Sequence, residues 1–139
     1  MSTISLTLDE IFELAKKTLL ANGCDDETAT ILSELIKNAE RDGSISHGLF
    51  RLPAYISGLK SGKINGKGKP EVKKVSASVI KVEGNNSLAP VVLNKSLPEL
   101  SKAAKENGVA VLAINNSHHM AAMWPETEKL AEDGLVAFA

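Results

Sequence analysis

All three histidines of this 139-residue chain lie in two polar segments, and none lies in an apolar run. Histidine is the side chain whose ordinary pKa lets it gain or lose a proton near neutral pH. The first segment places a hydroxyl, an imidazole and a guanidinium within six residues, at Ser46, His47 and Arg51. The second segment, residues 115–120, holds the other two histidines. This distribution indicates acid–base chemistry.

The first segment has the residue types needed to act on a small carboxylate. If a helical turn begins at Ser46, then His47 and Arg51 are four residues apart and share one face of it. A fixed guanidinium can bind a carboxylate through two parallel hydrogen bonds, and an imidazole one turn away can donate a proton to the reacting centre. Ser46 would then orient the imidazole or bind the substrate. A second interpretation stays open, in which Ser46 is only a helix N-cap and the other two are surface residues.

The second segment follows an apolar strand and precedes a helix. In open α/β sheets, ligands bind outside the carboxyl ends of strands, which is where Ser117, His118 and His119 are expected. Neighbouring histidines point in different directions, and neither a Cys nor a well-spaced third ligand accompanies them, so no metal site is predicted. The alternative is a polar connection between a strand and a helix.

Composition and charge exclude several classes of protein. Sixteen basic and seventeen acidic residues give a net charge of −1, which leaves no basic excess for nucleic acid. No run approaches the ~18 apolar residues of a membrane span, and the N-terminus lacks the features of a secretory signal. Cys24 is the only cysteine, so no internal disulfide is possible and a cytoplasmic location is expected. The glycines form no G-x-G-x-x-G or Walker pattern, so a Rossmann nucleotide site is not predicted.

Hydrophobic periodicity and turn residues predict the elements that hold these segments. Helices are expected from a capping box at Thr7–Glu10 to residues 22–23, from 25–26 to about 41–43, and from Pro53 onward. Two short strands with a turn near residues 77–78 come next, then a helix over about 89–106 with a kink or restart at 96–99. A buried strand over 109–114, a helix over about 121–132 and a strand over 134–139 follow.

These elements predict an α/β fold class, with helices around a small mixed or antiparallel sheet. The final predicted strand is apolar and carries no polar tail. Complete domains more often end in a polar, frayed segment. We therefore expect the chain to be the N-terminal part of a longer polypeptide.

Taken together, these segments resemble the non-Rossmann family of NAD(P)-dependent malate/L-lactate dehydrogenases over essentially the whole chain. The shared features are two opening helices, a β-hairpin, and the motifs Ser46-His47-Gly48, Arg51-Leu52-Pro53, Gly62-Lys63-Ile64-Asn65 and Ser117-His118-His119. Residues 41–53 and 117–125 look like the Δ1-piperideine-2-carboxylate/Δ1-pyrroline-2-carboxylate reductase branch. Two departures from the wider family agree with that branch. Ile45 stands where Asp is common, and residues 117–121 differ from the common Ser-Asn-His-Phe-Gly.

The resemblance implies roles for these residues. Ser46 and His47 would be catalytic, with His47 as the proton donor and Ser46 in its relay, and Arg51 would hold the substrate carboxylate. In some relatives the acid–base role belongs to the histidine at the position of His119, and the sequence leaves that choice open. The cofactor-binding stretch would comprise His119, Met120, Ala121, Ala122 and Met123.

The resemblance also implies a cofactor and partners. NADPH is the expected cofactor, with NADH possible, the substrate is a small carboxylate, and the protein is a homodimer without a nucleic-acid or membrane partner. Residues 1–70 would form the helical substrate-site part, and residues 71–139 the start of a cofactor-binding α/β part with the family's own architecture. Because the relay Asp and most cofactor residues would lie beyond Ala139, the chain alone is expected to be inactive.

The activity implied for the full-length enzyme is NADPH-dependent reduction of Δ1-piperideine-2-carboxylate or Δ1-pyrroline-2-carboxylate to L-pipecolate or L-proline. A rival within the same family is NAD-dependent oxidation of malate, lactate or ureidoglycolate. A rival from another class is an inactive truncated product or an oligomerisation module.

Overall fold

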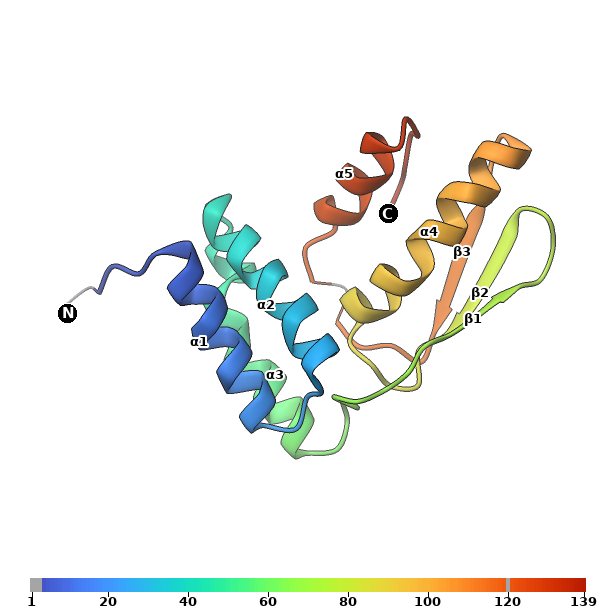
Figure 1. The fold of residues 1–139 in the computed structure, drawn as a ribbon. Helices are drawn as coiled ribbons and strands as arrows, with labels where there is room; N and C mark the ends of the chain where they lie inside the picture. Colours follow the sequence, from blue (N-terminus) through green and yellow to red (C-terminus); the bar gives the residue numbers. More distant parts are fainter. Residues whose placement is uncertain (1–3, 120) are drawn as a thin grey trace. The chain divides into compact units, whose positions relative to one another are not determined.

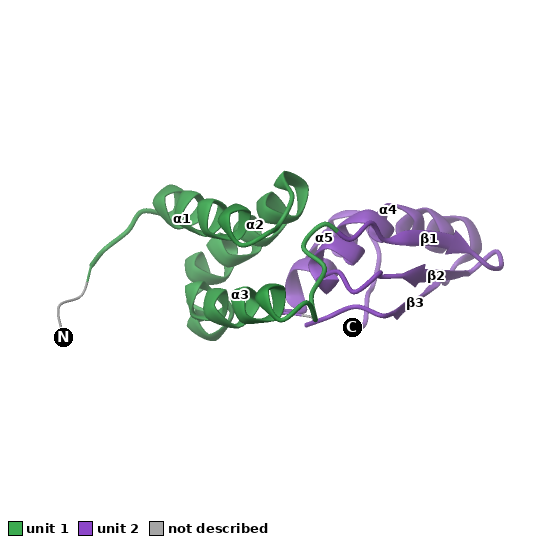
Figure 2. Cartoon of the chain, turned by 90° about the horizontal axis from the view of Figure 1, so that it is seen from below, with its two compact units in different colours: residues 1–67 green, residues 68–139 purple. Residues whose placement is uncertain are grey.

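The computed structural model describes residues 4–119 and 121–139, and the chain divides into two compact units. Met1–Lys67 is helical, and Gly68–Ala139 contains a sheet; Figure 2 draws these units in green and purple. The division lies close to residue 70, while the substrate and cofactor roles expected for the two parts remain predictions. Within the described residues, no helix is long and apolar enough to cross a membrane.

Local capping sets the starts of the first two helices. α1, Leu8–Ala21, follows Thr7, whose hydroxyl accepts from the Glu10 amide while the Glu10 carboxylate accepts from the Thr7 amide. This confirms the predicted capping box. α2, Asp26–Arg41, begins at Asp25, whose carboxylate accepts a first-turn amide. Such caps satisfy amides that have no partner inside the helix, and each is typically worth about 1 kcal/mol.

The helices of the first unit pack through the apolar faces that the periodicity predicts (Figure 1). The buried positions of α1 and α2 include Ile11, Ala15, Leu19, Leu32, Leu35, Ile36 and Ala39. Leu14 of α1 is 46% exposed. The third helix, α3, spans Leu52–Lys60 and buries Leu52 and Tyr55. The first unit is therefore a helical body with its core between α1 and α2.

A three-stranded sheet forms the second unit together with two helices. β1, Glu71–Lys74, pairs antiparallel with β2, Val79–Glu83, which confirms the predicted hairpin. β2 pairs parallel with β3, Val111–Asn115, so the sheet is mixed, in the order β1-β2-β3. The predicted fold class is thereby confirmed. Ile80 and Val82 of β2 are fully buried at the centre of the core.

The helix α4, Ala89–Asn107, connects the parallel strands β2 and β3 and lies along the sheet (Figure 1). It runs without interruption through Pro98, so the restart predicted at residues 96–99 does not occur. Proline removes only the amide that would bond the carbonyl of Asn94, an exposed residue where water can replace it. Gly108 ends the helix with φ of 80°, in the left-handed conformation that glycine adopts without strain.

Two predictions for the second unit are wrong. The strand expected to be buried, β3, alternates between exposed and half-buried residues, because it lies at the edge of the described sheet and packs α4 on one face. The strand expected over 134–139 is absent from the described sheet. At the start of that segment, the Leu135 amide bonds to the Leu130 carbonyl at the end of α5, Trp124–Glu132. Leu135 and Ala137 nevertheless pack on the core, whereas Val136 and Phe138 are exposed.

Candidate active site

The Ser-His segment of the first unit forms two separate 3₁₀ turns. The first spans Ile45–His47 and the second Leu49–Arg51, which continues directly into α3. Gly48 lies between them with ψ of −140°, outside the helical region. The predicted continuous helical turn from Ser46 is therefore wrong, and the four-residue spacing of His47 and Arg51 does not place them on one helix face.

Two serine hydroxyls hold one nitrogen of the His47 imidazole. Ser46 Oγ lies 3.0 Å and Ser44 Oγ 3.2 Å from His47 Nδ1. A hydroxyl can donate to this nitrogen or accept from it, so the pair suits either tautomer and directs Nε2 to other partners. Ser46 is thus a partner of the imidazole, as expected, and not an N-cap. Ser44 was not predicted, although its place three residues before His47 was a usable signal.

Arg51 carries a guanidinium without a carboxylate partner among residues 4–119 and 121–139. Its Nε is buried and makes no hydrogen bond in that part of the chain, while the residue as a whole is half-buried. A buried donor without an acceptor is costly, so a ligand that accepts from this nitrogen would be favoured. The side chain is therefore available to an anionic ligand.

Tyr55 lies one helical turn beyond Arg51 and is 2% exposed. Burial raises the pKa of its phenol to about 12, although the Arg51 charge acts in the opposite direction. The phenol is therefore neutral at physiological pH and adds no negative charge that would compete for the guanidinium.

In the second unit, the loop after β3 is bonded to the loop after β2. The amides of Gly84 and Asn86 donate to the carbonyls of Asn115 and Asn116, each at 2.8 Å. Further along the same two loops, the backbone amide of His118 donates to the Ser87 carbonyl. The carboxyl ends of the parallel strands thus hold the start of the second His segment in place, which is the location that the sequence predicted.

Five non-glycine residues with positive φ gather in these two loops. They are Asn85, Asn86, Asn116, His119 and Ala121, with φ between 49° and 58°. Asparagine tolerates this conformation, but for His and Ala the left-handed region costs roughly 1–2 kcal/mol. The Glu83 carboxylate braces the loops, since it accepts from the Asn116 side chain at 2.9 Å and from the Asn85 amide at 3.0 Å. Strained backbone of this kind clusters at functional sites.

The expected cofactor-binding stretch is partly accessible. His119 is exposed, Ala121 and Met123 are half-buried, and Ala122 is only 2% exposed, so Ala122 can offer a ligand little beyond its backbone. Met120 lies outside the described residues. These residues belong to the second unit, whereas Ser46, His47 and Arg51 belong to the first.

The first turn of α4 does not provide the amides that bind pyrophosphate in a Rossmann unit. The Ala89 amide donates to the His118 carbonyl at 2.8 Å, Pro90 has no amide hydrogen, and the Val91 amide bonds to the Leu88 carbonyl at 3.0 Å. A nucleotide would therefore have to bind this βαβ unit in another way. This agrees with the missing glycine motif.

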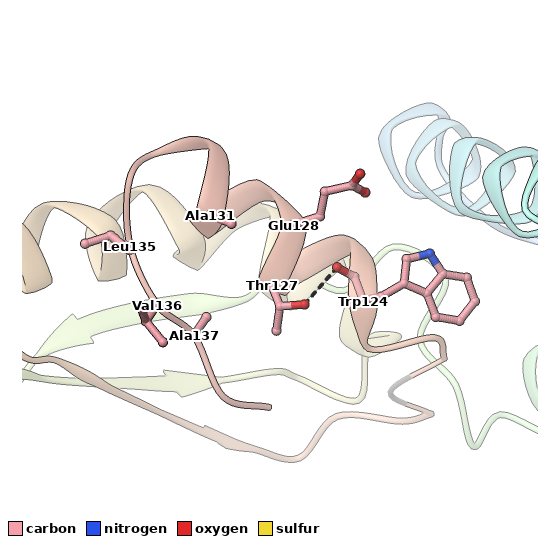
Figure 3. Close-up of a pocket in the computed structure, with 7 residues that line it drawn as sticks. All are labelled: Trp124, Thr127, Glu128, Ala131, Leu135, Val136 and Ala137. Carbon is pink, nitrogen blue, oxygen red and sulfur yellow. Dashed lines mark hydrogen bonds between the residues drawn. The ribbon is translucent and has the colours of Figure 1, made fainter.

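An open groove lies elsewhere in the second unit, between α5 and residues 135–137 (Figure 3). Its lining comprises Trp124, Thr127, Glu128, Ala131, Leu135, Val136 and Ala137. No residue expected in the active site lines it. Among the described residues, no three His, Cys, Asp or Glu side chains gather as metal ligands would.

Comparison with known proteins places the chain in a family. The profile of the malate/L-lactate dehydrogenase family matches residues 6–139. The chain is 40% identical over 137 residues to Delta(1)-pyrroline-2-carboxylate/Delta(1)-piperideine-2-carboxylate reductase of Pseudomonas syringae pv. tomato, covering 99% of this chain and 40% of the relative. It is 36% identical over 134 residues to (2R)-3-sulfolactate dehydrogenase (NADP(+)) of Chromohalobacter salexigens, covering 96% of this chain and 40% of the relative.

Solved structures agree with these relatives. The crystal structure of delta1-piperideine-2-carboxylate reductase from Pseudomonas syringae matches with a TM-score of 0.90 and 39% identity, over 95% of this chain and 40% of the other. Malate dehydrogenase from Pyrococcus horikoshii matches with a TM-score of 0.86 and 29% identity, over 94% and 38%. The chain thus spans about 40% of the length of the curated relatives it matches. It belongs to the malate/L-lactate dehydrogenase family.

Proposed function

We propose that these residues form part of an NADPH-dependent reductase of cyclic imino acids, which converts Δ1-pyrroline-2-carboxylate or Δ1-piperideine-2-carboxylate to L-proline or L-pipecolate. The observation that carries the proposal is the buried, unpartnered Nε of Arg51, four residues after an imidazole that serine hydroxyls hold. A cyclic imino acid offers the carboxylate and the protonatable nitrogen that this pair can recognise. Relatives that bear the names of such reductases support the choice of substrate.

Arg51 binds the substrate carboxylate and so fixes which face of the ring is attacked. The nicotinamide cofactor, when bound, supplies a hydride to the carbon of the C=N bond. His47 supplies the proton that the ring nitrogen needs, which makes the carbon electrophilic and completes the reduction to the amine. Ser44 and Ser46 hold the imidazole through Nδ1, so that Nε2 faces the substrate.

The stretch from His119 to Met123 lies beside the cofactor in this proposal. The positive φ of His119 and Ala121 directs the backbone of an exposed loop, and the hydrogen bonds of Glu83 and Ser87 fix where that loop begins. If His119 were the acid–base residue instead, its replacement would abolish turnover while the His47 variant remained active.

The proposal is tested with the protein encoded by the complete reading frame that contains these residues. NADPH oxidation is measured with each cyclic imine. His47→Gln should lower kcat by about 10²- to 10⁴-fold, the usual contribution of a general acid. Arg51→Ala should raise KM by about 10- to 100-fold, because it removes charge-assisted hydrogen bonds to the carboxylate.

Arg41→Ala is the matched control, since Arg41 is exposed and pairs with its neighbour Asp42. Near wild-type kcat and KM in both active-site variants would refute the assigned roles. Turnover of the cyclic imines that stays at the rate without enzyme would refute the substrate class.

A 2-hydroxy-acid dehydrogenase is the second candidate function, and the resemblance to a sulfolactate dehydrogenase supports it. Arg51 would again bind a carboxylate, and His47 would take the proton from the hydroxyl group. A panel of malate, lactate, ureidoglycolate and sulfolactate with NAD or NADP separates the candidates. An inert fragment is the remaining alternative. In the 139-residue chain, fluorescence of Trp124, next to Met123, should change on NADPH binding, and a constant signal would favour that alternative.

A further inference from the structure

The carboxylate of Glu40, from the preceding helix, caps the N-terminus of the helical residues 49–60, which include Arg51. Glu40 lies in the last turn of α2, and its Oε1 accepts from the Leu49 amide at 2.8 Å. The residues at the start of that run make no side-chain cap of their own. Since the first amides of a helix lack partners inside it and its N-terminus favours negative charge, Glu40 does what a local cap would do.

The same side chain lies where a Cβ at position 48 would be. A Cβ on Gly48 would come within 2.8 Å of Glu40 Cγ and closer still to its carboxyl carbon and Oε1. The φ of Gly48 is −84°, so a left-handed conformation is not the reason. The Glu40 side chain occupies the space that a side chain at position 48 would need.

This contact lies between the two groups of the proposed site. His47 precedes Gly48, and the Arg51 amide donates to the Gly48 carbonyl at 3.0 Å. On the other side of His47, the Ser44 amide donates to the carbonyl of Ala39, the neighbour of Glu40 in α2, at 2.8 Å. The turn is thus attached to the end of α2 both before and after the imidazole.

We infer that Glu40 is a positioning residue, which fixes the backbone between His47 and Arg51 and thereby sets the imidazole relative to the guanidinium. The inference rests on the proposed function for the roles of those two side chains. Glu40 does not act on the substrate itself. Its carboxylate holds the Leu49 amide by a hydrogen bond and occupies the space beside Gly48.

A double-mutant cycle tests the contact without any assay of activity. The urea midpoint of unfolding is measured for Gly48→Ala, Glu40→Ala and the double variant. Gly48→Ala should lower the midpoint when Glu40 is present, because the Glu40 side chain must leave the Leu49 amide to make room, and less in the Glu40→Ala background, where that bond is already gone. Glu34→Ala, which removes an exposed carboxylate from the same helix, is the matched control and should leave the Gly48→Ala effect unchanged. Additive effects of Glu40→Ala and Gly48→Ala would overturn the inference.

The positioning role is tested by NMR on the same chain. Glu40→Ala should shift the ring signals of His47, leave those of His118 and His119 in place, and speed hydrogen exchange of the Leu49 amide by roughly tenfold or more. Glu40→Gln should restore most of both, because its amide oxygen can accept the same bond. Unchanged His47 signals and unchanged Leu49 exchange in Glu40→Ala would overturn the inference.

Binding of pyrrole-2-carboxylate, a planar cyclic carboxylate, connects the contact to the site. Its affinity should fall about tenfold in Glu40→Ala and recover in Glu40→Gln. Equal affinity in wild type and Glu40→Ala would overturn the positioning role. If the wild-type chain binds none, the proposed function fails for this chain, and the ring signals with Leu49 exchange still decide on Glu40.

Discussion

Replacing Gly84 with alanine should destabilise the second unit, because the added Cβ would collide with backbone carbonyl oxygens of the facing loop. Gly84 directly follows β2, and its amide donates to the Asn115 carbonyl at 2.8 Å. A Cβ at this position would lie 2.7 Å from the Asn116 carbonyl oxygen and 3.0 Å from that of Asn115. Both oxygens accept amides of the facing loop, so neither can move aside as a side-chain tip would. The two loops must therefore separate to make room.

The expected cost follows from these contacts. Overpacking of a closely packed site costs about 1–3 kcal/mol. If the loops separate far enough to lose the bond from Gly84 to Asn115, a further 0.5–1.5 kcal/mol or so is lost. Gly108→Ala provides a comparison, because Gly108 has φ of 80° and open space around it, so alanine there costs only the backbone strain of the left-handed region, roughly 1–2 kcal/mol. Gly84→Ala should therefore lower the Tm more than Gly108→Ala does, by about 5 °C for costs near the middle of these ranges.

Thermal unfolding followed by circular dichroism measures the difference in Tm. Fluorescence of Trp124 adds a reporter close to the loop, because Trp124 follows directly on the segment His119–Met123 and begins α5. The reasoning is refuted if Gly84→Ala is no more destabilising than Gly108→Ala. A tolerated alanine would mean that the close approach of the two loops does not constrain the segment expected at the cofactor.

Three further predictions follow from titratable groups. The hydrogen bond from Ser101, and after it the Lys105 charge, lower the pKa of Asp133. The ionised Asp133 therefore stabilises the folded chain above the ordinary carboxyl pKa, and this contribution is lost as pH falls through the lowered value. Asp133→Asn should remove this pH dependence from urea unfolding curves. Burial raises the pKa of Tyr55, the single tyrosine, to about 12. The neutral phenol therefore favours the folded chain below its ordinary pKa of about 10, and this contribution is lost as pH rises toward 12. A tyrosine that ionises near pH 10 in an ultraviolet titration would contradict this prediction. Burial, and after it the Asp25 charge, raise the pKa of the Cys24 thiol to about 11. A disulfide reagent at mildly alkaline pH should therefore react slowly with Cys24 in the native chain and rapidly in urea. Equal rates under the two conditions would show that the thiol is exposed.

Local signals predicted the helices and the hairpin well. The capping box at Thr7 and the helix start at residues 25–26 depend on residues within three positions of one another, and the structure confirms both. The turn before Val79 likewise joins neighbouring strands, so its pairing needs no distant partner. Sequence patterns are informative here because each structure is decided by contacts close along the chain.

The candidate site was predicted less completely, because its geometry depends on contacts between elements. Helical spacing was assumed for His47 and Arg51, but Gly48 interrupts the helix where the carboxylate of Glu40 fills the adjacent space. Glu40 lies on the preceding helix, and no local motif pairs it with the Leu49 amide. The residue types were therefore identified from the sequence, whereas their mutual placement required the fold.

The two edges of the sheet explain why the apolar strands were misjudged. β1 carries Lys73 and Lys74, and charged side chains on an edge strand oppose pairing with a further strand. β3 has no charged residue and is apolar on both faces, which is typical of a strand that is covered on both sides. Val111 of β3 is nevertheless 55% exposed. In the C-terminal segment, which was also expected to be a strand, Val136 and Phe138 are 87% and 95% exposed. An apolar pattern shows that a segment is suited to burial, but burial also needs a second surface, and the described residues provide one on a single face only.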